Sequence, residues 1–332
     1  MANTKWRNQT SVIEFVLLGS ENLPELQNLL FLLFLVTYIV TVAGNILIVA
    51  LVVADQHPHT PMYFFLGNLS CLETCYSTTL LPRMLASLLT GDRIVFVRCC
   101  IVQFCCLCSL AATECYLLAA MSYDEYLAIC KPLHFAVVMN GRFILQLAAG
   151  SWILGSLACS TIIYLMSQLI FCGPNEINHF FCDFTPIRKL SCSENYLVVL
   201  LDSILAYIFT LPPFPLPVIS YIFIIATILK IPSTTGKQKA FSTCSSQLII
   251  VKIFCLTLMT VYMFPKTNQL RAFHKAFSVG YTVLTPLVNP LIYSLRNKEV
   301  KAALRKAASK FVPFTRHHIN RANCFSLAMK WR

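Results

Sequence analysis

The sequence predicts an all-α membrane protein: a seven-transmembrane helix bundle followed by a short amphipathic helix. Seven long apolar stretches run through the 332 residues, the segments between them are short, and only 12% of the residues are charged. A run of about 20 apolar residues crosses the hydrocarbon core of a bilayer as a helix, and in lipid such a helix satisfies its own backbone hydrogen bonds. A soluble domain carries about a quarter charged residues. One membrane domain therefore accounts for most of the chain, without a separate soluble module.

Each stretch is long and apolar enough for one span. The first, fourth and seventh hold no charge, whereas each of the others holds at least one, including Glu73 and Arg83 in the second, Glu114 in the third, Asp202 in the fifth and Lys252 in the sixth. The predicted spans are residues 26–54, 60–89, 99–126, 143–171, 196–229, 239–264 and 276–295.

The ends of the chain differ from the spans. Residues 1–25 are polar and lack the apolar core and cleavage site of a signal peptide, so we expect an extracellular N-terminal segment before the seven-span domain of residues 26–295. Residues 296–310 alternate basic and small apolar side chains, which predicts an amphipathic helix on the membrane surface. Residues 311–332 show no helical period and are expected to form a disordered cytoplasmic tail.

Basic residues indicate the orientation. With an outside N-terminus, the inner loops and tail hold 15 Lys and Arg side chains, and the outer segments hold ten when Arg83, near the outer end of the second span, is counted with them. Cytoplasmic loops carry such an excess. Asn8, in Asn8-Gln9-Thr10, is then an extracellular glycosylation acceptor. The formal charge of +12 does not indicate a nucleic-acid partner, because the excess lies beside the spans, where it meets membrane lipid.

The sixteen cysteines fall into two groups. Most lie inside spans, where a cysteine is a small apolar packing residue. Cys172, Cys182 and Cys192 instead lie in the long outer segment between the fourth and fifth spans, where disulfides persist. A fourth partner is needed, and Cys99 or Cys100 can supply it. A zinc site is the weaker alternative, because the ten-residue spacing lacks close cysteine pairs.

A set of motifs, in order along the chain, strongly resembles the olfactory receptors within the rhodopsin-like G-protein-coupled receptors. The resemblance covers residues 10–310. The motifs are Gly44-Asn45, Pro61-Met62-Tyr63-Phe64-Phe65-Leu66, Met121-Ser122-Tyr123-Asp124, Tyr126-Leu127-Ala128-Ile129-Cys130, His179-Phe180-Phe181-Cys182-Asp183, Ser220-Tyr221, Lys239-Ala240-Phe241-Ser242-Thr243-Cys244 and Asn289-Pro290-Leu291-Ile292-Tyr293.

The resemblance implies a plasma-membrane receptor for small, volatile and mostly apolar odorants. It implies coupling to a stimulatory heterotrimeric G protein that raises cyclic AMP, and disulfides joining Cys100 to Cys182 and Cys172 to Cys192. No cofactor is expected. The sequence has no clustered catalytic set, so no enzyme is expected either.

Carried over by position, the ligand cavity lies between the third, fifth, sixth and seventh spans, in the outer half of the membrane. Its expected lining is Phe104, Cys108, Ala111, Ala112, Leu205, Phe209, Cys255, Leu258, Met259 and Tyr262. For each residue taken singly, helix-to-helix packing is the alternative role, since small residues pack in this way in membranes. The coupling and switch positions are Asp124, Glu125, Tyr126, Tyr221, Lys239, Asn289, Pro290 and Tyr293.

The inner end of the third span departs from the family pattern. The family has Asp-Arg-Tyr where this chain has Asp124-Glu125-Tyr126. Two neighbouring carboxylates repel, so G-protein coupling is expected to be lost or altered. Glu125 itself is expected to lie in water at the interface, without harm to folding. The family's Phe-Tyr-Gly in the sixth span also reads Phe254-Cys255-Leu256, so a receptor-like protein with impaired or absent coupling is the alternative.

Three charges are expected to cluster near the middle of the membrane. At 1.5 Å per residue, Glu73, Glu114 and Lys252 lie at similar depths, and a buried lysine needs a partner. We expect Lys252 to pair with Glu114 or Glu73, replacing the sodium ion that related receptors hold near these positions; no other metal site is expected. A transporter or channel is the remaining alternative, but seven spans do not divide into two equal repeats.

Overall fold

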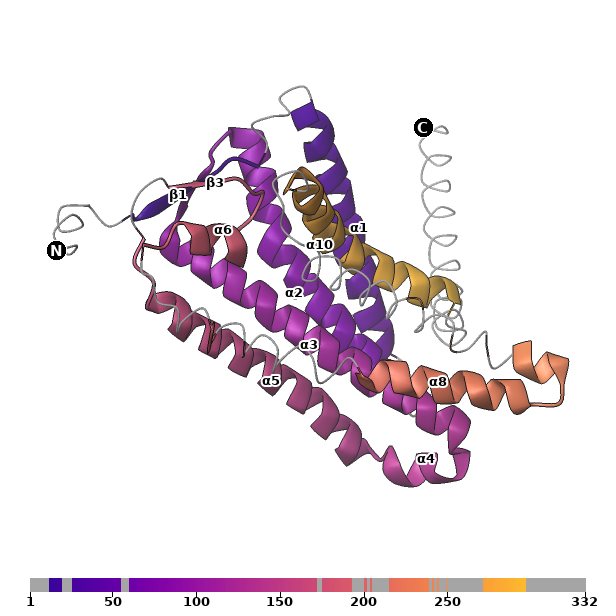
Figure 1. Cartoon of the computed structure of the whole chain (residues 1–332). Helices are drawn as coiled ribbons and strands as arrows, with labels where there is room; N and C mark the ends of the chain where they lie inside the picture. The colour runs from indigo at the N-terminus through magenta and orange to yellow at the C-terminus, as the bar shows by residue number, and fades with distance from the viewer. Residues whose placement is uncertain are drawn as a thin grey trace, which may run out of the picture.

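The computed structural model is a bundle of long helices with a small β-sheet at one end (Figure 1). It describes residues 12–19, 26–54, 60–171, 175–192, 215–238 and 271–296, with single positions at 200–201, 204, 241, 244 and 249. The helices are α1 (Gln27–Ala54), α2 (Pro61–Thr90), α3 (Val97–Cys130), α4 (Pro132–Val138), α5 (Gly141–Ser167), α6 (Phe184–Lys189), α8 (Pro215–Lys230) and α10 (Arg271–Arg296). The strands are β1 (Glu14–Leu17), β2 (Ile94–Phe96) and β3 (Glu176–Ile177).

Local sequence signals explain several helix ends. Pro61 begins α2, at a position where its missing N–H would have had no partner within the helix. Gly91 ends α2 with a φ of 74°, which glycine adopts freely, and its N–H donates to the Ser87 carbonyl at 3.0 Å. The Asn140 side chain caps α5 by accepting a hydrogen bond from the Phe143 N–H at 3.0 Å.

Contacts between the described helices give their relative directions. In α1 and α2, Gln27 bonds to Leu88, which joins the start of α1 to the end of α2 and makes the pair antiparallel. The pairs Tyr76–Thr282 and Glu73–Asn289 make α10 antiparallel to α2. In α3 and α8 the contacts ascend together, from Glu125–Tyr221 to Cys130–Thr227, so these two helices are parallel. Thus α1, α3, α8 and α10 run from the sheet end toward the opposite end, where α4 lies, whereas α2 returns.

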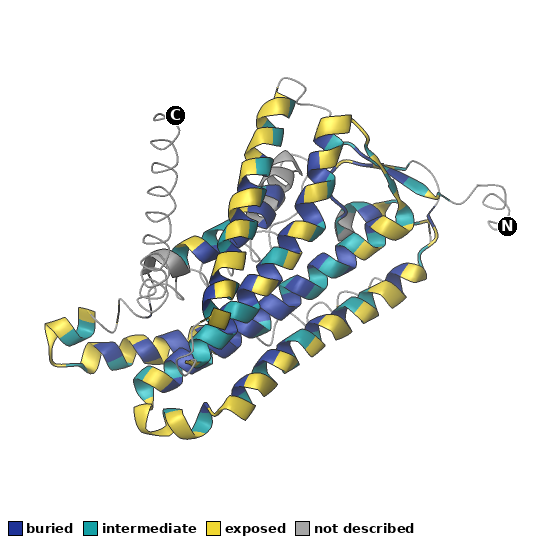
Figure 2. Cartoon of the chain, turned by 180° about the vertical axis from the view of Figure 1, so that it is seen from behind, coloured by how far each residue is buried: buried dark blue, intermediate teal, exposed yellow. Residues whose placement is uncertain are grey.

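α3 occupies the centre of the bundle. Its buried residues extend from Cys100 to Leu127, whereas α1 and α5 turn apolar faces outward (Figure 2). Gly155 of α5 lies directly against α3, because a Cβ added there would stand 2.0 Å from Thr113 Oγ1 and 2.6 Å from the Ser109 carbonyl oxygen. Broad exposed apolar faces of this kind suit contact with lipid rather than water.

Three of the described helices, α1, α3 and α5, are long and apolar enough to cross a membrane. α2 is equally long, but its mean hydropathy is lowered by polar residues that include Glu73 and Arg83. Shorter apolar helical segments are found at Pro215–Lys230 and Thr282–Ile292. The structure therefore supports a helical membrane protein, whereas the predicted count of seven spans extends beyond the described residues.

The small sheet is absent from the all-α prediction. β1 lies between β2 and β3, pairing antiparallel with β2 and parallel with β3. Its Phe15 is fully buried and meets the Phe171 ring edge-on at a centroid distance of 5.3 Å. The segment before α1, predicted only as polar and extracellular, is thus folded over the sheet end in part.

Candidate ligand-binding and coupling sites

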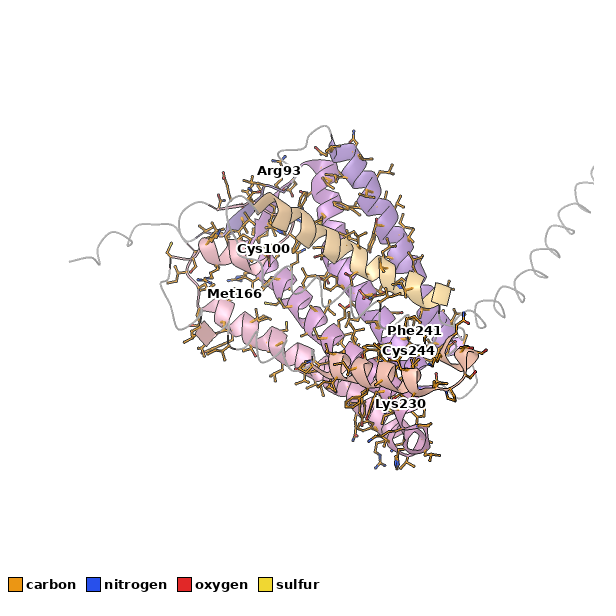
Figure 3. The ribbon with its side chains drawn as sticks, turned by 45° about the vertical axis from the view of Figure 1, so that its right-hand side comes forward. Arg93, Cys100, Met166, Lys230, Phe241 and Cys244 are labelled. Carbon is orange, nitrogen blue, oxygen red and sulfur yellow. A yellow bond between two sulfur atoms is a disulfide. The ribbon has the colours of Figure 1, made fainter. Side chains whose placement is uncertain are left out.

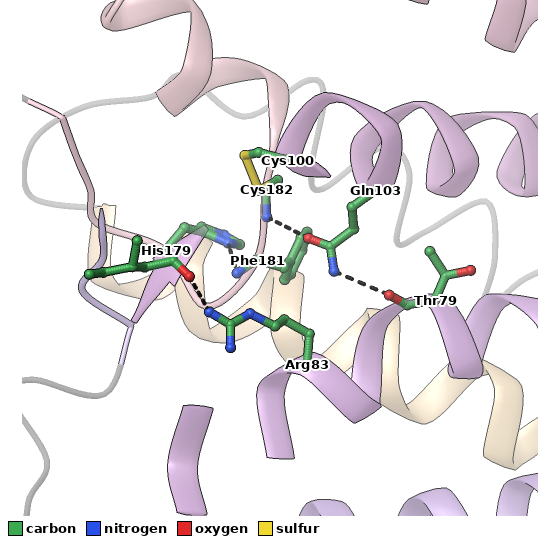
Figure 4. Close-up of a disulfide and its surroundings, with 8 residues drawn as sticks. Thr79, Arg83, Cys100, Gln103, His179, Phe181 and Cys182 are labelled. Carbon is green, nitrogen blue, oxygen red and sulfur yellow. Dashed lines mark hydrogen bonds between the residues drawn. A yellow bond between two sulfur atoms is a disulfide. The ribbon is translucent and has the colours of Figure 1, made fainter. Parts of the chain in front are cut away.

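The predicted disulfide between Cys100 and Cys182 is present at the sheet end. It joins the start of α3 to the segment after β3, across 82 residues of sequence (Figure 4). Gln103, one turn along α3, supports the same segment. Its Oε1 accepts a hydrogen bond from the Cys182 N–H at 3.3 Å, and its Nε2 donates to the Thr79 carbonyl of α2 at 3.2 Å. The bond ties the loop to the start of α3, and the Gln103 bridge links that point to α2.

The second predicted disulfide remains a prediction. Cys192 is disulfide-bonded, and its N–H donates to the Ile170 carbonyl at 2.9 Å. Phe171 forms an antiparallel bridge with Ser191, so the two chain segments run side by side at this point. The predicted partner Cys172 lies outside the described residues, as does the glycosylation acceptor Asn8.

Contacts of Arg83 hold the β2 end of this region. Arg83 of α2 donates to the Ile94 carbonyl of β2 and lies 3.8 Å from the Asp92 carboxylate. Arg83, which lies in the predicted second span, is therefore located at the sheet end, where its contacts hold the turn between α2 and β2.

The described part of the predicted ligand cavity lies on α3. Phe104 is buried and Cys108 partly buried in an apolar core at the sheet end, together with residues from β1, α5 and the disulfide loop. Ala112 is buried and Ala111 half-buried. A small hollow at this end is lined by Leu17, Gly19, Met84, Ser87, Leu88 and Phe180, and no predicted ligand residue lines it. Leu205, Phe209, Cys255, Leu258, Met259 and Tyr262 lie outside the described residues, so the cavity remains a prediction.

Glu73, Glu114 and Asn289 form a buried cluster between α2, α3 and α10. Their side chains are at most 3% exposed. The Asn289 amide donates to Glu73 Oε1, and Glu114 lies within hydrogen-bonding reach of both residues. The two acidic positions that the sequence places at one depth are thus in contact. Two carboxylates this close repel, and a shared proton or a cation would remove the repulsion.

The same cluster joins most of the described bundle. Tyr76 hydrogen-bonds Thr282 one turn toward the sheet end, and the Asn45 amide of α1 donates to the Pro286 carbonyl at 3.2 Å. Among the described residues, no group of three or more His, Cys, Asp or Glu side chains could hold a metal ion. Lys252 lies outside the described residues, so its pairing with Glu114 or Glu73 and its replacement of a sodium ion remain predictions.

Glu125 is buried, so the expectation that it lies in water at the interface is wrong. The residue is 6% exposed, and the Tyr221 hydroxyl of α8 donates to its Oε2 at 3.1 Å. The reason is tertiary: α3 continues to Cys130, and α8 covers its side there. The neighbouring Asp124 is also buried, at 5% exposed.

The other switch positions fall at the opposite end or near it. Tyr126 lies beside Phe223 with ring centroids 5.9 Å apart, and Pro290 of α10 packs against Gly44 of α1. Figure 3 shows Phe241 and Cys244 at the end where Lys230 lies, away from Cys100 and Met166. Lys239 and the side chain of Tyr293 are outside the described part of the chain.

Sequence reasoning missed three contributors: Gln103, Arg83 as a loop anchor, and the acceptor role of Glu125 toward Tyr221. Gln103 and Glu125 depend on partners far away in the sequence, whereas Arg83 contacts Ile94 only 11 positions later. Tyr221 is separated from Glu125 by 96 positions, and Gln103 from Cys182 by 79. Only the glutamine's position near a predicted disulfide cysteine was a usable signal.

Comparison with known proteins gives consistent matches along the chain. A family model described as olfactory receptor matches residues 34–310. Human olfactory receptor 6C4 is 43% identical over 306 residues, which cover 92% of this chain and 99% of the relative. Human olfactory receptor 6B1 is 46% identical over 301 residues (91% and 96%). Rat olfactory receptor 1f45 is 44% identical over 306 residues (92% and 98%).

Proposed function

The chain belongs to the olfactory receptor family, and on that basis we propose that it binds small, mostly apolar odorants and signals through a stimulatory G protein to raise cyclic AMP. Members of the family are G-protein-coupled receptors and not enzymes, so the chain is a multi-pass membrane receptor of the odorant-sensing class. The observation that carries the proposal is similarity over nearly the full length of both chains, at 43–46% identity with the three relatives above.

The proposed architecture is a seven-span bundle with its N-terminus outside the cell and its C-terminus in the cytosol of the plasma membrane. The helix directions support it, because α1, α3, α8 and α10 share one direction, as the first, third, fifth and seventh spans must. A disulfide at the sheet end suits the oxidising outer side. The excess of Lys and Arg in the inner loops and tail points the same way.

The proposed ligand cavity lies beneath the sheet end, beside α3. Phe104 and Cys108 face an apolar surrounding there, which suits an apolar ligand. Binding by burial alone contributes about 25 cal/mol per Å² of apolar surface, so a cavity with few polar anchors selects weakly among odorants of similar shape.

Whether the receptor couples depends on the opposite end of α3. The alternative is a receptor-like chain whose coupling is impaired or absent, because Glu125 replaces the arginine of the family pattern. The burial of Glu125 supports this alternative, since a buried acidic side chain bonded to Tyr221 cannot present the donors that a guanidinium offers.

The test is a cyclic AMP assay with the full chain displayed on cells and exposed to a broad odorant panel. The parent and Glu125→Arg run side by side, and N-terminal antibody staining verifies equal display. An odorant-dependent rise in either form supports an odorant receptor. A rise in Glu125→Arg alone favours the uncoupled alternative. Silence of both at equal display, while a related receptor responds in the same cells, argues against the proposed function.

The buried acidic pair adds a second proposal, that Lys252 neutralises Glu73 or Glu114. The contact between the two carboxyls supports it, because they need a compensating positive charge or a proton. Glu114→Lys should then reduce surface display much more than Glu114→Gln. Equal and small effects of the two substitutions contradict pairing with Glu114.

A further inference from the structure

At the end of the bundle opposite the sheet, α3 and α8 meet along a seam of three contacts. At its start the Tyr221 hydroxyl donates to Glu125 Oε2 at 3.1 Å. Next, the rings of Tyr126 and Phe223 lie 5.9 Å apart between centroids. At its end Cys130 Sγ and Thr227 Oγ1 are 3.2 Å apart.

The first contact is the buried polar one. Tyr221 is 7% exposed and Glu125 6%, and Ile224 and Ile228 of α8 are buried on the same side. Glu125 Oε1 has no hydrogen-bond partner among the described residues, so the tyrosine hydroxyl is the side-chain donor found for this carboxyl. A buried hydrogen bond with an acidic side chain contributes more than one in water, and its loss leaves the carboxyl unsatisfied.

We propose that Glu125 is a positioning residue that, through Tyr221, fastens the end of α8 to the end of α3. An arginine at this position has only donors and could not accept from Tyr221. Glu125 therefore offers the Tyr221 hydroxyl an acceptor that an arginine lacks, and the hydrogen bond they form acts as a clasp between the two helices.

The effect of the clasp on signalling rests on the proposed function, because the clasp lies at the end where the G protein would dock. Its geometry, however, can be tested without odorant or G protein. Thr227→Cys places a second thiol beside the native Cys130 in the full-length chain in membranes. Under mild oxidation, a disulfide between positions 130 and 227 forms at a rate that reports how often the two helices meet there. Mass spectrometry measures that rate from the disulfide-linked peptide pair. A rival bond from Cys130 to Cys244 gives peptides of different mass.

The matched control is Ile225→Cys, which puts a thiol on an exposed face of the same turn and should form little bond. In the Thr227→Cys background, Tyr221→Phe removes one oxygen and should slow bond formation about tenfold, as should Glu125→Leu. Glu125→Gln keeps an acceptor oxygen and should restore the rate to within about twofold of the parent. The Cys100–Cys182 bond, at the far end, serves as the folding reference in every variant.

Two results overturn the inference: parental rates in both Tyr221→Phe and Glu125→Leu, or a rate in Glu125→Gln as low as in Glu125→Leu. If Glu125→Leu loses the reference disulfide, Tyr221→Phe alone decides. If both the parent and Glu125→Arg stay silent in the cyclic AMP assay at equal display while the oxidation rates are as expected, the proposed function is refuted and the clasp still stands.

Discussion

At the scale of single residues, the bundle depends on a few positions where two backbones come close. Gly155 is one, since its missing side chain lets α5 lie against the Ser109 carbonyl of α3. Membrane helices use small residues in this way, because lipid offers no hydrophobic drive for association and close packing must supply it. Gly150, five residues earlier on the same helix, has open space around it instead.

These two glycines give a matched prediction. Gly155→Ala forces α5 away from α3 and should destabilise the protein by about 1–3 kcal/mol, as overpacking does. Gly150→Ala should be neutral or stabilising by about 0.5–1 kcal/mol, since alanine favours the helix. The thermal midpoint of the detergent-solubilised protein checks both. A midpoint for Gly155→Ala at or above that of Gly150→Ala contradicts the close approach.

At the scale of elements, the sheet and the disulfide loop form one cap over the sheet end. β1 contributes the buried Phe15, the loop contributes Cys182 and Phe171, and α3 contributes Cys100 and Phe104 to the same apolar core. The cap is thus assembled from three segments that are distant in sequence, and loosening any one of them exposes the others.

The burial of the strand can be tested by comparing Phe15 with Ile13, the exposed residue just before the strand. Phe15→Ala removes a fully buried ring and should cost about 3–5 kcal/mol of local stability, whereas Ile13→Ala changes a side chain that is 67% exposed. Hydrogen–deuterium exchange of residues 12–19 should speed strongly in the first variant and stay parental in the second. Equal exchange in both variants would show that β1 is not held by its buried face.

The disulfide has an equally close control in the adjacent cysteine. Cys100→Ser removes the bond to Cys182 and should cost about 2–5 kcal/mol, which lowers surface display. Cys99→Ser changes an exposed free thiol and should leave display unchanged. Flow cytometry against an N-terminal tag measures both, and a loss in Cys99→Ser equal to that in Cys100→Ser would count against the pairing.

At the scale of the whole molecule, alternating helix directions and a buried polar centre describe one bundle. Glu73, Glu114, Asn289 and Asn45 tie four helices together near mid-length. Outward faces of α1 and α5 remain apolar. A polar centre with an apolar outer surface is the reverse of the arrangement in a soluble protein and fits a protein surrounded by lipid.

The orientation makes a global prediction. Tags on the two termini should be accessible from opposite sides of intact cells, with the N-terminal tag stained without permeabilisation and the C-terminal tag only after it. A cytosolic marker protein, which should be stained only after permeabilisation, controls for leakage. Staining of both tags in unpermeabilised cells would exclude an odd number of spans.

The sequence predicted well what depends on neighbours along the chain. The predicted second span, 60–89, agrees with α2 at Pro61–Thr90 because Pro61 and Gly91 act locally. Contact between Glu73 and Glu114 was foreseeable because rise per residue converts position into depth. β1 was missed, since four residues pair only with partners about 80 and 160 positions away. The burial of Glu125 was missed for the same reason, because α8 creates it.

The place of β1 in the middle of its sheet also dictates an order of events during synthesis. Val16 leaves the ribosome about 160 residues before Glu176, its parallel partner. At about 5–20 residues per second, the strand waits roughly 8–32 s before its second neighbour exists. Through that interval Phe15 lacks the residues from Phe171 to Ile187 that later help to bury it, so this segment exposes an apolar side chain that a chaperone can bind.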